Sequence, residues 1–354
     1  MKFGLFNLMP LRTPATSTST VLKDTLDMVG MAEQAGFEVA WFAEHHFSNY
    51  SISPSPVMMA AHVAGRTSRI KLGTAVVVLP LYHPMRLVQE IAMLDLQSGG
   101  RAVVGIGSGY QHYEFDRFGV SLDDKIERML EYWTVIESGL RTQHIDFQGK
   151  YVSAPDTHFL LAPLQKPFPP FFVASMTPPA LKRAAETGAT IFTSGTFLGT
   201  EGLIANRDKM HRTLRQLGLP VDSVPLAVQQ YIHVTHSKAD AREAAEGVRY
   251  TARVLAALGQ PGPTIIDGFI QPKELENEPS LETFEKNIII GDPEYVAERI
   301  ANDVALLNPV HYSCYFHFGG MDSGKAKKSM ELFGSRVMPL LESRKERQKE
   351  AATA

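Results

Sequence analysis

Short apolar segments alternate along the chain with longer segments in which apolar residues recur on one helical face. Each short segment is almost continuously apolar, which is typical of parallel strands buried on both faces. Eight such segments are predicted as strands, at residues 2–8, 38–43, 70–80, 102–109, 170–175, 189–195, 225–235 and 311–320. Helical periodicity predicts helices from Leu22 to a stop at Gly36 and at about 55–67, 84–97, 121–140, 178–187, 201–217, 238–257, 294–307 and 324–346.

Eight strands, each followed by a helix, favour an α/β fold of the (β/α)8 TIM-barrel type. The main rival is a doubly wound open sheet, which would place a Gly-rich turn after the first strand. The segment "NLMPLRTPATSTST" is rich in Pro, Ser and Thr instead, so the rival ranks lower. We expect a single barrel domain over residues 1–346 and a frayed, charged tail over 347–354.

Two segments interrupt the regular pattern. Residues 144–170 contain the hairpin-like "FQGKYV" and many prolines, which indicates an insertion before the fifth strand. Residues 258–293, after the seventh strand, are rich in Pro, Gly and Glu and show little periodicity. A loop of that length inside a compact domain is usually functional or disordered.

Composition narrows the class of function. The formal net charge of −3 argues against a nucleic-acid or membrane-surface partner. The single cysteine, Cys314, excludes a disulfide framework and a cysteine-based zinc site. The start "MKFGLFNLMP" shows no targeting leader and no apolar run is long enough to span a membrane, so we expect a cytoplasmic protein.

The second predicted strand ends abruptly in an acid and two imidazoles, Glu44, His45 and His46. The carboxyl ends of barrel strands form the active-site face. Because side chains alternate along an extended chain, the two histidines should point in different directions. That divergence disfavours a metal pair, and no metal site is expected here. A general acid or base fits better, because imidazole titrates near neutral pH; the alternative is a hydrogen-bonded core histidine.

Several stretches together resemble the bacterial luciferase and luciferase-like flavin-dependent monooxygenase family. They are "MKFGLF", "AEQAGFEVAWFAEHHF" (32–47), "IKLGTAVVVLPLYHPMRLVQEIAMLD" (70–95), "SGGRAVVGIGSGYQHYEFDRFGV" (98–120), "VASMTPPALKRAAETGA" (173–189) and "GDPEYVAERI" (291–300). The match covers most of the chain. The resemblance to the luciferase catalytic subunit is closest around His45. Light emission is not implied.

The resemblance implies a (β/α)8 barrel that binds reduced FMN at its mouth. A separate NAD(P)H:flavin reductase would supply the reduced flavin, and O2 would add at flavin C4a to give a peroxyflavin that oxygenates a small-molecule substrate. By match, His45 is the catalytic acid or base, with Glu44 and His46 in support. A homodimer or related oligomer is expected.

The resemblance also implies which residues bind the cofactor. A non-prolyl cis peptide would join Ala75 and Val76 beneath the flavin ring, although a plain core strand is the alternative. Gly107 and Gly109 permit close backbone approach, and Tyr110 would contact the ribityl or phosphate end. Ser175, Met176 and Thr177 would bind the phosphate. Thr177 also suits a helix N-cap followed by proline, and an ordinary capped helix is the alternative there.

The chain departs from the family pattern at two positions. Gly107 stands where luciferase has a reactive cysteine, and Ser108 stands where many relatives place an arginine against the FMN phosphate. A serine hydroxyl donates a hydrogen bond but brings no charge. Arg128 is a weak candidate for the missing charge.

Two other functions remain open. One is a deazaflavin-dependent oxidoreductase of the same superfamily, which would transfer hydride without O2. The other is a non-catalytic luciferase-like subunit.

The resemblance also implies a role for the second insertion. Residues 258–293 could close over the flavin through Ile265, Ile266, Phe269 and Ile270, as a mobile loop does in luciferase.

Overall fold

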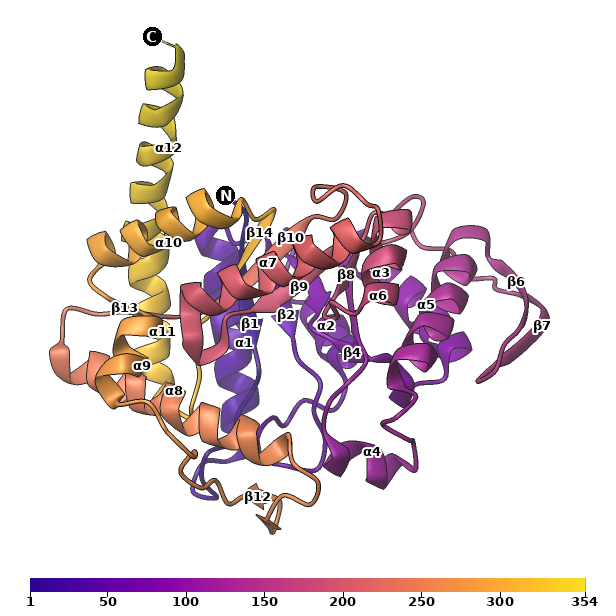
Figure 1. Ribbon diagram of the computed structural model, residues 1–354, viewed down its shortest axis with the longest axis horizontal. Helices are drawn as coiled ribbons and strands as arrows, with labels where there is room; N and C mark the ends of the chain where they lie inside the picture. The colour runs from indigo at the N-terminus through magenta and orange to yellow at the C-terminus, as the bar shows by residue number, and fades with distance from the viewer. Residues whose placement is uncertain (354) are drawn as a thin grey trace.

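Eight parallel barrel strands close into a barrel with helices around it (Figure 1). We call each barrel strand a stave, because one of them is divided into two short strands. A computed structural model describes the backbone of residues 1–353 and the side chains of residues 1–347. In chain order the staves are β1 (Phe3–Asn7), β2 (Val39–Phe42), β3 with β4 (Lys71–Thr74 and Val77–Val78), β5 (Ala102–Gly107), β8 (Phe171–Val173), β9 (Thr190–Ser194), β10 (Leu226–Val234) and β14 (His311–Tyr315). All eight predicted strands and the predicted barrel are confirmed.

The barrel is closed by parallel pairing at every stave. β1 pairs with β2 on one side and with β14 on the other, and β10 pairs with both β14 and β9. Because every stave runs the same way, all their carboxyl ends meet at one mouth, and residues that follow the strands are brought together there.

The other end of the barrel interior is a packed core. Trp41 fills it, with its ring 4.9 Å from that of Phe172 and 5.2 Å from that of Phe192. Gly73 makes room, because a β-carbon at this position would overlap the Trp41 ring. Because side chains fill this end, the space for a ligand within the described barrel lies at the mouth, beside the predicted His45.

Most predicted helices form close to their expected bounds. The helices and short turns are α1 (Thr18–Ala35), α2 (Pro56–Ala64), η1 (Leu79–Leu81), α3 (Pro84–Ser98), α4 (His112–Phe118), α5 (Lys125–Thr142), α6 (Pro178–Thr187), η2 (Thr196–Leu198), α7 (Gly199–Gln216), α8 (Lys238–Leu258), α9 (Leu281–Asn287), α10 (Pro293–Leu307), α11 (Ser323–Leu332), η3 (Phe333–Val337) and α12 (Met338–Thr353). The structure adds α4 and α9, and the helix predicted at 324–346 is interrupted by the π-helical turn η3.

Both predicted insertions are present, and the second is more regular than expected. The first forms a hairpin of β6 (His144–Gln148) and β7 (Ser153–His158), which extends from α5 (Figure 1). The segment 258–293 contains a small hairpin of β11 (Ile265–Ile266) and β12 (Phe269–Ile270), then α9, then β13 (Ile289–Gly291), which pairs with β10. The interpretation of this segment as a weakly patterned loop is therefore confirmed at residues 259–264 and 271–280 and wrong at the short elements, where isoleucines in β13 and a Ser-capped α9 give regular structure.

No helix within the described residues is long and apolar enough to cross a membrane. The frayed tail expected at 347–354 stays a prediction: the helical backbone continues to Thr353, and residue 354 lies outside the described part of the chain.

Candidate active site

A cavity of about 380 Å³ opens at the carboxyl ends of β2, the β3–β4 stave, β5 and β8. It is lined by Glu44, His45, Ala75, Val76, Val78, Gly107, Ser108, Gly109, Tyr110, Glu114 and Ala174. Six of the nine predicted site residues, from His45 to Tyr110, therefore lie together around one cavity, whereas Ser175, Met176 and Thr177 follow directly after its last lining residue.

His45 is held by an acid that sequence reasoning missed. Its Nδ1 lies 3.0 Å from Oε1 of Glu114, a residue of α4 that is 1% exposed. The same oxygen accepts the backbone N–H of His46 at 2.7 Å. A carboxylate accepts hydrogen bonds, so Nδ1 carries the proton and Nε2 is the nitrogen left for chemistry at the cavity.

The side-chain amide of Gln111 completes this arrangement. Its Nε2 lies 2.9 Å from Nδ1 of His45 and 3.2 Å from the hydroxyl of Tyr110, while its buried Oε1 has no partner among the described residues. Amide orientation is assigned from the hydrogen-bond network, and exchanging the two atoms places an acceptor before both neighbours. In that orientation the hydroxyl of Tyr110 donates to Oε1 and His45 keeps its proton on Nδ1, whereas the buried NH2 group of Gln111 has no acceptor among the described residues.

The second histidine belongs to the wall of the barrel. Nε2 of His46 lies 3.0 Å from Oε1 of Glu44, and Oε2 of Glu44 accepts the backbone N–H of Val78 at 3.2 Å. Burial raises the pKa of Glu44, and the His46 hydrogen bond opposes that rise. The two adjacent imidazoles therefore bind different carboxylates, as the alternation of side chains predicted.

The backbone of the β3–β4 stave lies against β5 at the cavity floor. The peptide between Ala75 and Val76 is cis, which confirms the expected bond. A β-carbon at Gly107 would lie 2.7 Å from a methyl of Val76. A cysteine at position 107 would thus displace Val76, so glycine is the residue compatible with this floor.

Ser108 and Tyr110 lie at the rim of the cavity. Ser108 is 8% exposed, and the one partner of its hydroxyl among the described residues is the neighbouring Gly109 carbonyl, at 3.4 Å. The ring of Tyr110 is partly exposed, but its hydroxyl packs inside against Gln111. Burial of that hydroxyl raises the pKa of Tyr110 to about 12, so it stays protonated and can donate.

The predicted phosphate segment forms the start of α6. Thr177 is the N-cap residue in extended conformation, and its side chain makes no capping hydrogen bond, while its hydroxyl lies 3.2 Å from that of Ser175. Pro178 and Pro179 follow, and proline has no N–H. The helix start therefore offers fewer backbone donors than expected, and the Ser175 and Thr177 hydroxyls become the main candidates for an anion.

Arg128 is already engaged elsewhere. From α5, its guanidinium pairs with Asp124 at 3.1 Å and stacks 4.4 Å above the ring of Tyr151, which lies in the turn between β6 and β7. Among the described residues that line the cavity, none is lysine or arginine.

The β11–β12 hairpin lies beside the mouth. Asn49 donates its backbone N–H to the Gly268 carbonyl at 2.8 Å, and its Oδ1 accepts the N–H of Ile270 at 2.9 Å. Ile270 forms a buried cluster with Val254 and Leu258 of α8, and Tyr50, whose ring is 4.6 Å from that of His45, packs against this cluster. The hairpin is thus connected to the catalytic candidate through one aromatic side chain.

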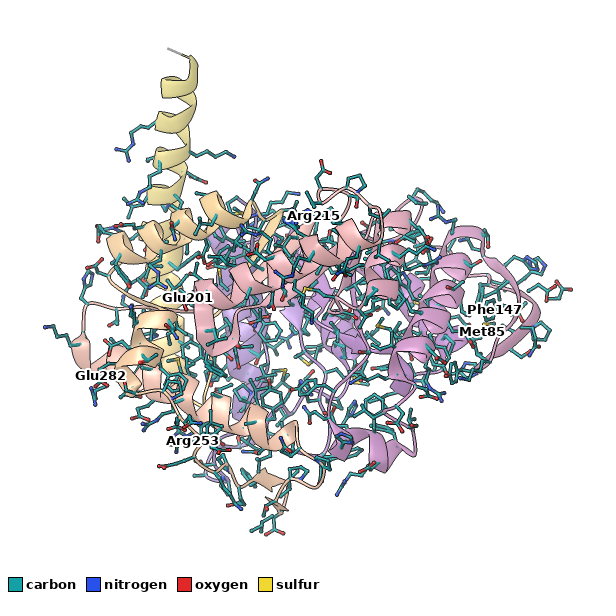
Figure 2. The ribbon with its side chains drawn as sticks, in the orientation of Figure 1. Met85, Phe147, Glu201, Arg215, Arg253 and Glu282 are labelled. Carbon is teal, nitrogen blue, oxygen red and sulfur yellow. The ribbon has the colours of Figure 1, made fainter. Side chains whose placement is uncertain are left out.

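An ion pair also secures this segment. Arg253 projects from α8 (Figure 2) and donates to both oxygens of Glu278, each at 2.6 Å.

The cavity suits a flat ring system bound against backbone. Its floor is formed by small residues, Ala75, Gly107 and Ala174, and its polar groups gather at one side around His45. These features fit an isoalloxazine ring. They supply no positive charge for a phosphate, which leaves hydroxyl groups to hold it.

Comparison with known proteins identifies the family. Residues 1–307 match the model of the luciferase-like monooxygenases, and the chain belongs to this family. It is 33% identical over 343 residues to the uncharacterised protein y4vJ of Sinorhizobium fredii, covering 97% of this chain and 98% of that protein. It is 26% identical over 346 residues to the oxygenase component of the flavin-dependent trigonelline monooxygenase of Acinetobacter baylyi, covering 96% and 95% of the two chains.

Solved structures share the fold. The monooxygenase RslO1 from Streptomyces bottropensis superposes with a TM-score of 0.81 at 23% identity, over 96% of this chain and 99% of that one. The oxygenating constituent of 3,6-diketocamphane monooxygenase from Pseudomonas putida, in complex with FMN, gives a TM-score of 0.75 at 20% identity, over 96% and 98%. An F420-dependent secondary alcohol dehydrogenase gives 0.73 at 18% identity, over 96% and 98%. This protein is a luciferase-like monooxygenase, and the fold alone does not choose between FMN and the deazaflavin F420.

Proposed function

We propose that this protein is the oxygenase component of a two-component system that uses reduced FMN and O2 to oxygenate a small organic substrate. The observation that carries the proposal is the placement of His45, which is held at Nδ1 by Glu114 and lines a cavity floored by Ala75, Val76 and Gly107. The trigonelline relative, itself an oxygenase component, supports a separate flavin reductase as partner.

Bound reduced flavin would supply the electrons that activate O2, with one oxygen atom passing to the substrate and the other leaving as water. The chain's own residues would hold the flavin in place and transfer a proton. Backbone and small side chains at Ala75, Val76 and Gly107 would support the ring, and the Ser108, Ser175 and Thr177 hydroxyls with Met176 and Tyr110 would surround the ribityl phosphate. His45 would give or take a proton at Nε2, and Glu114 would stabilise the imidazole in the required tautomer.

Exclusion of water is the second task of the site, because activated oxygen that is not used is lost as hydrogen peroxide. The β11–β12 hairpin, docked on Asn49 and Tyr50, would cover the mouth during turnover.

Two alternatives predict different outcomes in one assay. The purified protein is mixed either with FMN, an NADH-driven flavin reductase and ¹⁸O2 or with F420, in each case together with aldehydes, amines, sulfonates, and N-heteroaromatic and other aromatic compounds. We expect a product that carries one ¹⁸O atom. Hydride transfer with F420 and no ¹⁸O incorporation would instead support the deazaflavin enzyme. A protein that binds reduced FMN but transforms no compound with either cofactor would support a non-catalytic subunit.

A further inference from the structure

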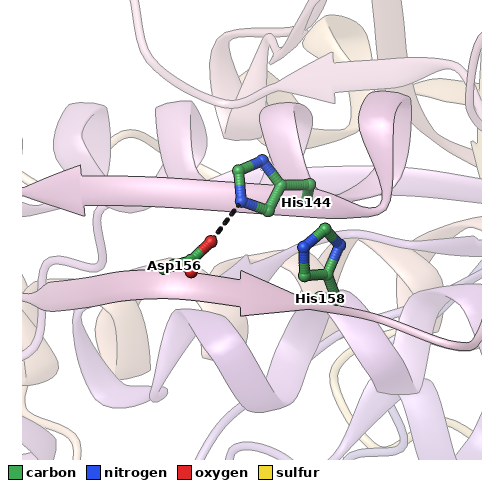
Figure 3. Close-up of side chains that lie close together, drawn as sticks. All are labelled: His144, Asp156 and His158. Atoms are coloured by element: carbon green, nitrogen blue, oxygen red, sulfur yellow. Dashed lines mark hydrogen bonds and ion pairs between the residues drawn. The ribbon is translucent and has the colours of Figure 1, made fainter.

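The β6–β7 hairpin brings two imidazoles and a carboxylate close together (Figure 3), and none of the three residues lines the cavity described above. Nε2 of His144 lies 3.0 Å from Oδ1 of Asp156, and the rings of His144 and His158 are 4.3 Å apart. One ligand atom from each of the three residues lies within 4.8 Å of the other two.

Strand pairing explains why the three side chains meet. His144 and His158 are directly opposite each other in the antiparallel register, so their side chains share a face. Asp156 lies beside the register shift of the hairpin, where regular alternation of side chains is interrupted, and its positive φ of 29° and its 3.0 Å contact with His144 place its carboxylate on the same face. Ile145 and Ala154 are buried on the opposite face and hold the hairpin against the protein.

The far end of the hairpin is also fixed. The carboxylate of Glu131 on α5 accepts the backbone N–H groups of Lys150, Tyr151 and Val152, each at 2.8 Å. His144 directly follows Gln143, the residue that ends α5. The cluster therefore lies at the base of a hairpin that is anchored at both ends, and only its exposed side chains need to move to bind a ligand.

Two histidines and one carboxylate are a ligand set suited to first-row transition metals. A tetrahedral Zn²⁺ with bonds of about 2.0–2.1 Å places its ligand atoms roughly 3.3 Å apart. The pair formed by His144 and Asp156 is already at that spacing, and rotation of the exposed His158 side chain can bring the third atom in.

We propose that His144, Asp156 and His158 form a binding site for a divalent transition-metal ion such as Zn²⁺, which clamps the base of the hairpin. Three protein ligands leave at least one position for water. The alternative is a pair of stacked imidazoles with one ion pair and no affinity for metal. The metal site and the stacked pair predict different results, because only the metal site makes Zn²⁺ binding depend on all three residues.

Isothermal titration of the untagged, EDTA-treated full-length protein with Zn²⁺ tests the site. We expect one Zn²⁺ per chain in the parent. His144→Ala and His158→Ala should each weaken Zn²⁺ binding by at least about 10-fold. Loss of a residue that merely hydrogen-bonds to a metal ligand already lowers metal affinity by about that factor. Asp156→Asn should weaken binding similarly, and it keeps the size of the side chain if the alanine variants fold poorly.

His62→Ala is the matched control, because it removes one exposed imidazole from α2 and leaves the cluster intact. It should bind Zn²⁺ like the parent. Absence of saturable binding by the parent overturns the proposal, as does equal affinity of His62→Ala, His144→Ala and His158→Ala.

Discussion

The Nδ1 atom of His45 lies 3.0 Å from Oε1 of Glu114, although the two residues are 69 positions apart in the chain. One comes from the loop after β2 and the other from α4, after β5. The closed barrel brings these two loops to the same mouth, and the buried carboxylate gives the imidazole one orientation and one tautomer.

Replacement of Glu114 by glutamine should lower turnover while leaving flavin binding unchanged. The variant keeps the shape of the side chain but loses the charged acceptor for His45. A hydrogen bond to a charged group contributes about 1.5–3 kcal/mol, so we expect kcat to fall roughly 10–100-fold. Steady-state kinetics and titration with reduced FMN measure the two quantities separately.

A double variant distinguishes positioning from general damage to the site. If Glu114 acts through His45, Glu114→Gln should have little further effect on kcat in a His45→Ala background. Fully multiplicative effects of the two substitutions would show that Glu114 does not act through the imidazole.

Ser108→Arg should tighten the binding of FMN. Ser108 lies at the cavity rim, and no described lining residue carries a positive charge. Since an arginine forms charge-assisted bonds to phosphate, we expect the Kd for FMN to fall about 10-fold and the Kd for riboflavin to stay the same. Equal binding of riboflavin and FMN by the unmodified protein would show that the phosphate site is assigned wrongly.

The barrel could be predicted because buried parallel strands leave a local mark, a run of apolar residues such as Val39–Phe42. The place of His45 followed from the same logic. Glu114 could not be predicted, because α4 has only seven residues and its acid resembles a solvated surface residue until long-range packing buries it. Likewise, the contact between the Gln111 amide and His45 and the packing of Tyr50 against the cluster that contains Ile270 join distant segments of the chain, which no local pattern records.

Loss of the β11–β12 hairpin should uncouple oxygen use from product formation. Replacement of residues 262–272 with a short Gly/Ser linker leaves the Arg253–Glu278 pair in place and should leave the barrel folded. We expect a higher ratio of hydrogen peroxide to product, because water reaches the site. The same peroxide-to-product ratio in the shortened protein and the parent would mean that the hairpin is not a cover.

A pair of single substitutions refines this test. Ile270 of β12 is buried against Val254 and Leu258 of α8, whereas Ile266 in the same hairpin is 57% exposed. Ile270→Ala should therefore loosen the docked hairpin and increase its sensitivity to protease more than Ile266→Ala does. Similar cleavage rates for the two variants would contradict the docking seen here.

Stability should fall as the pH drops below about 6.5, in part because of His311. Nε2 of His311 accepts the indole N–H of Trp41 at 2.9 Å, and burial lowers the pKa of His311. The unfolded chain takes up a proton that the folded protein resists, so stability is present above the unfolded pKa and is lost below it. Urea unfolding from pH 8 to 5 should show a smaller slope of stability against pH for His311→Gln, by a fraction of the one-proton limit of about 1.4 kcal/mol per pH unit. An unchanged slope would mean that His311 does not contribute.

The central claim is that His45 transfers a proton during oxygenation, and single-turnover product formation by His45→Ala tests it most directly. The protein is loaded with reduced FMN, mixed with O2 and substrate, and the product is quantified against time. His112→Ala, which removes an imidazole from the start of α4, is the control. We expect His45→Ala to bind reduced FMN normally and to form product at least about 100-fold more slowly than the parent and the control. Product formation by His45→Ala at the parent's rate would contradict the account.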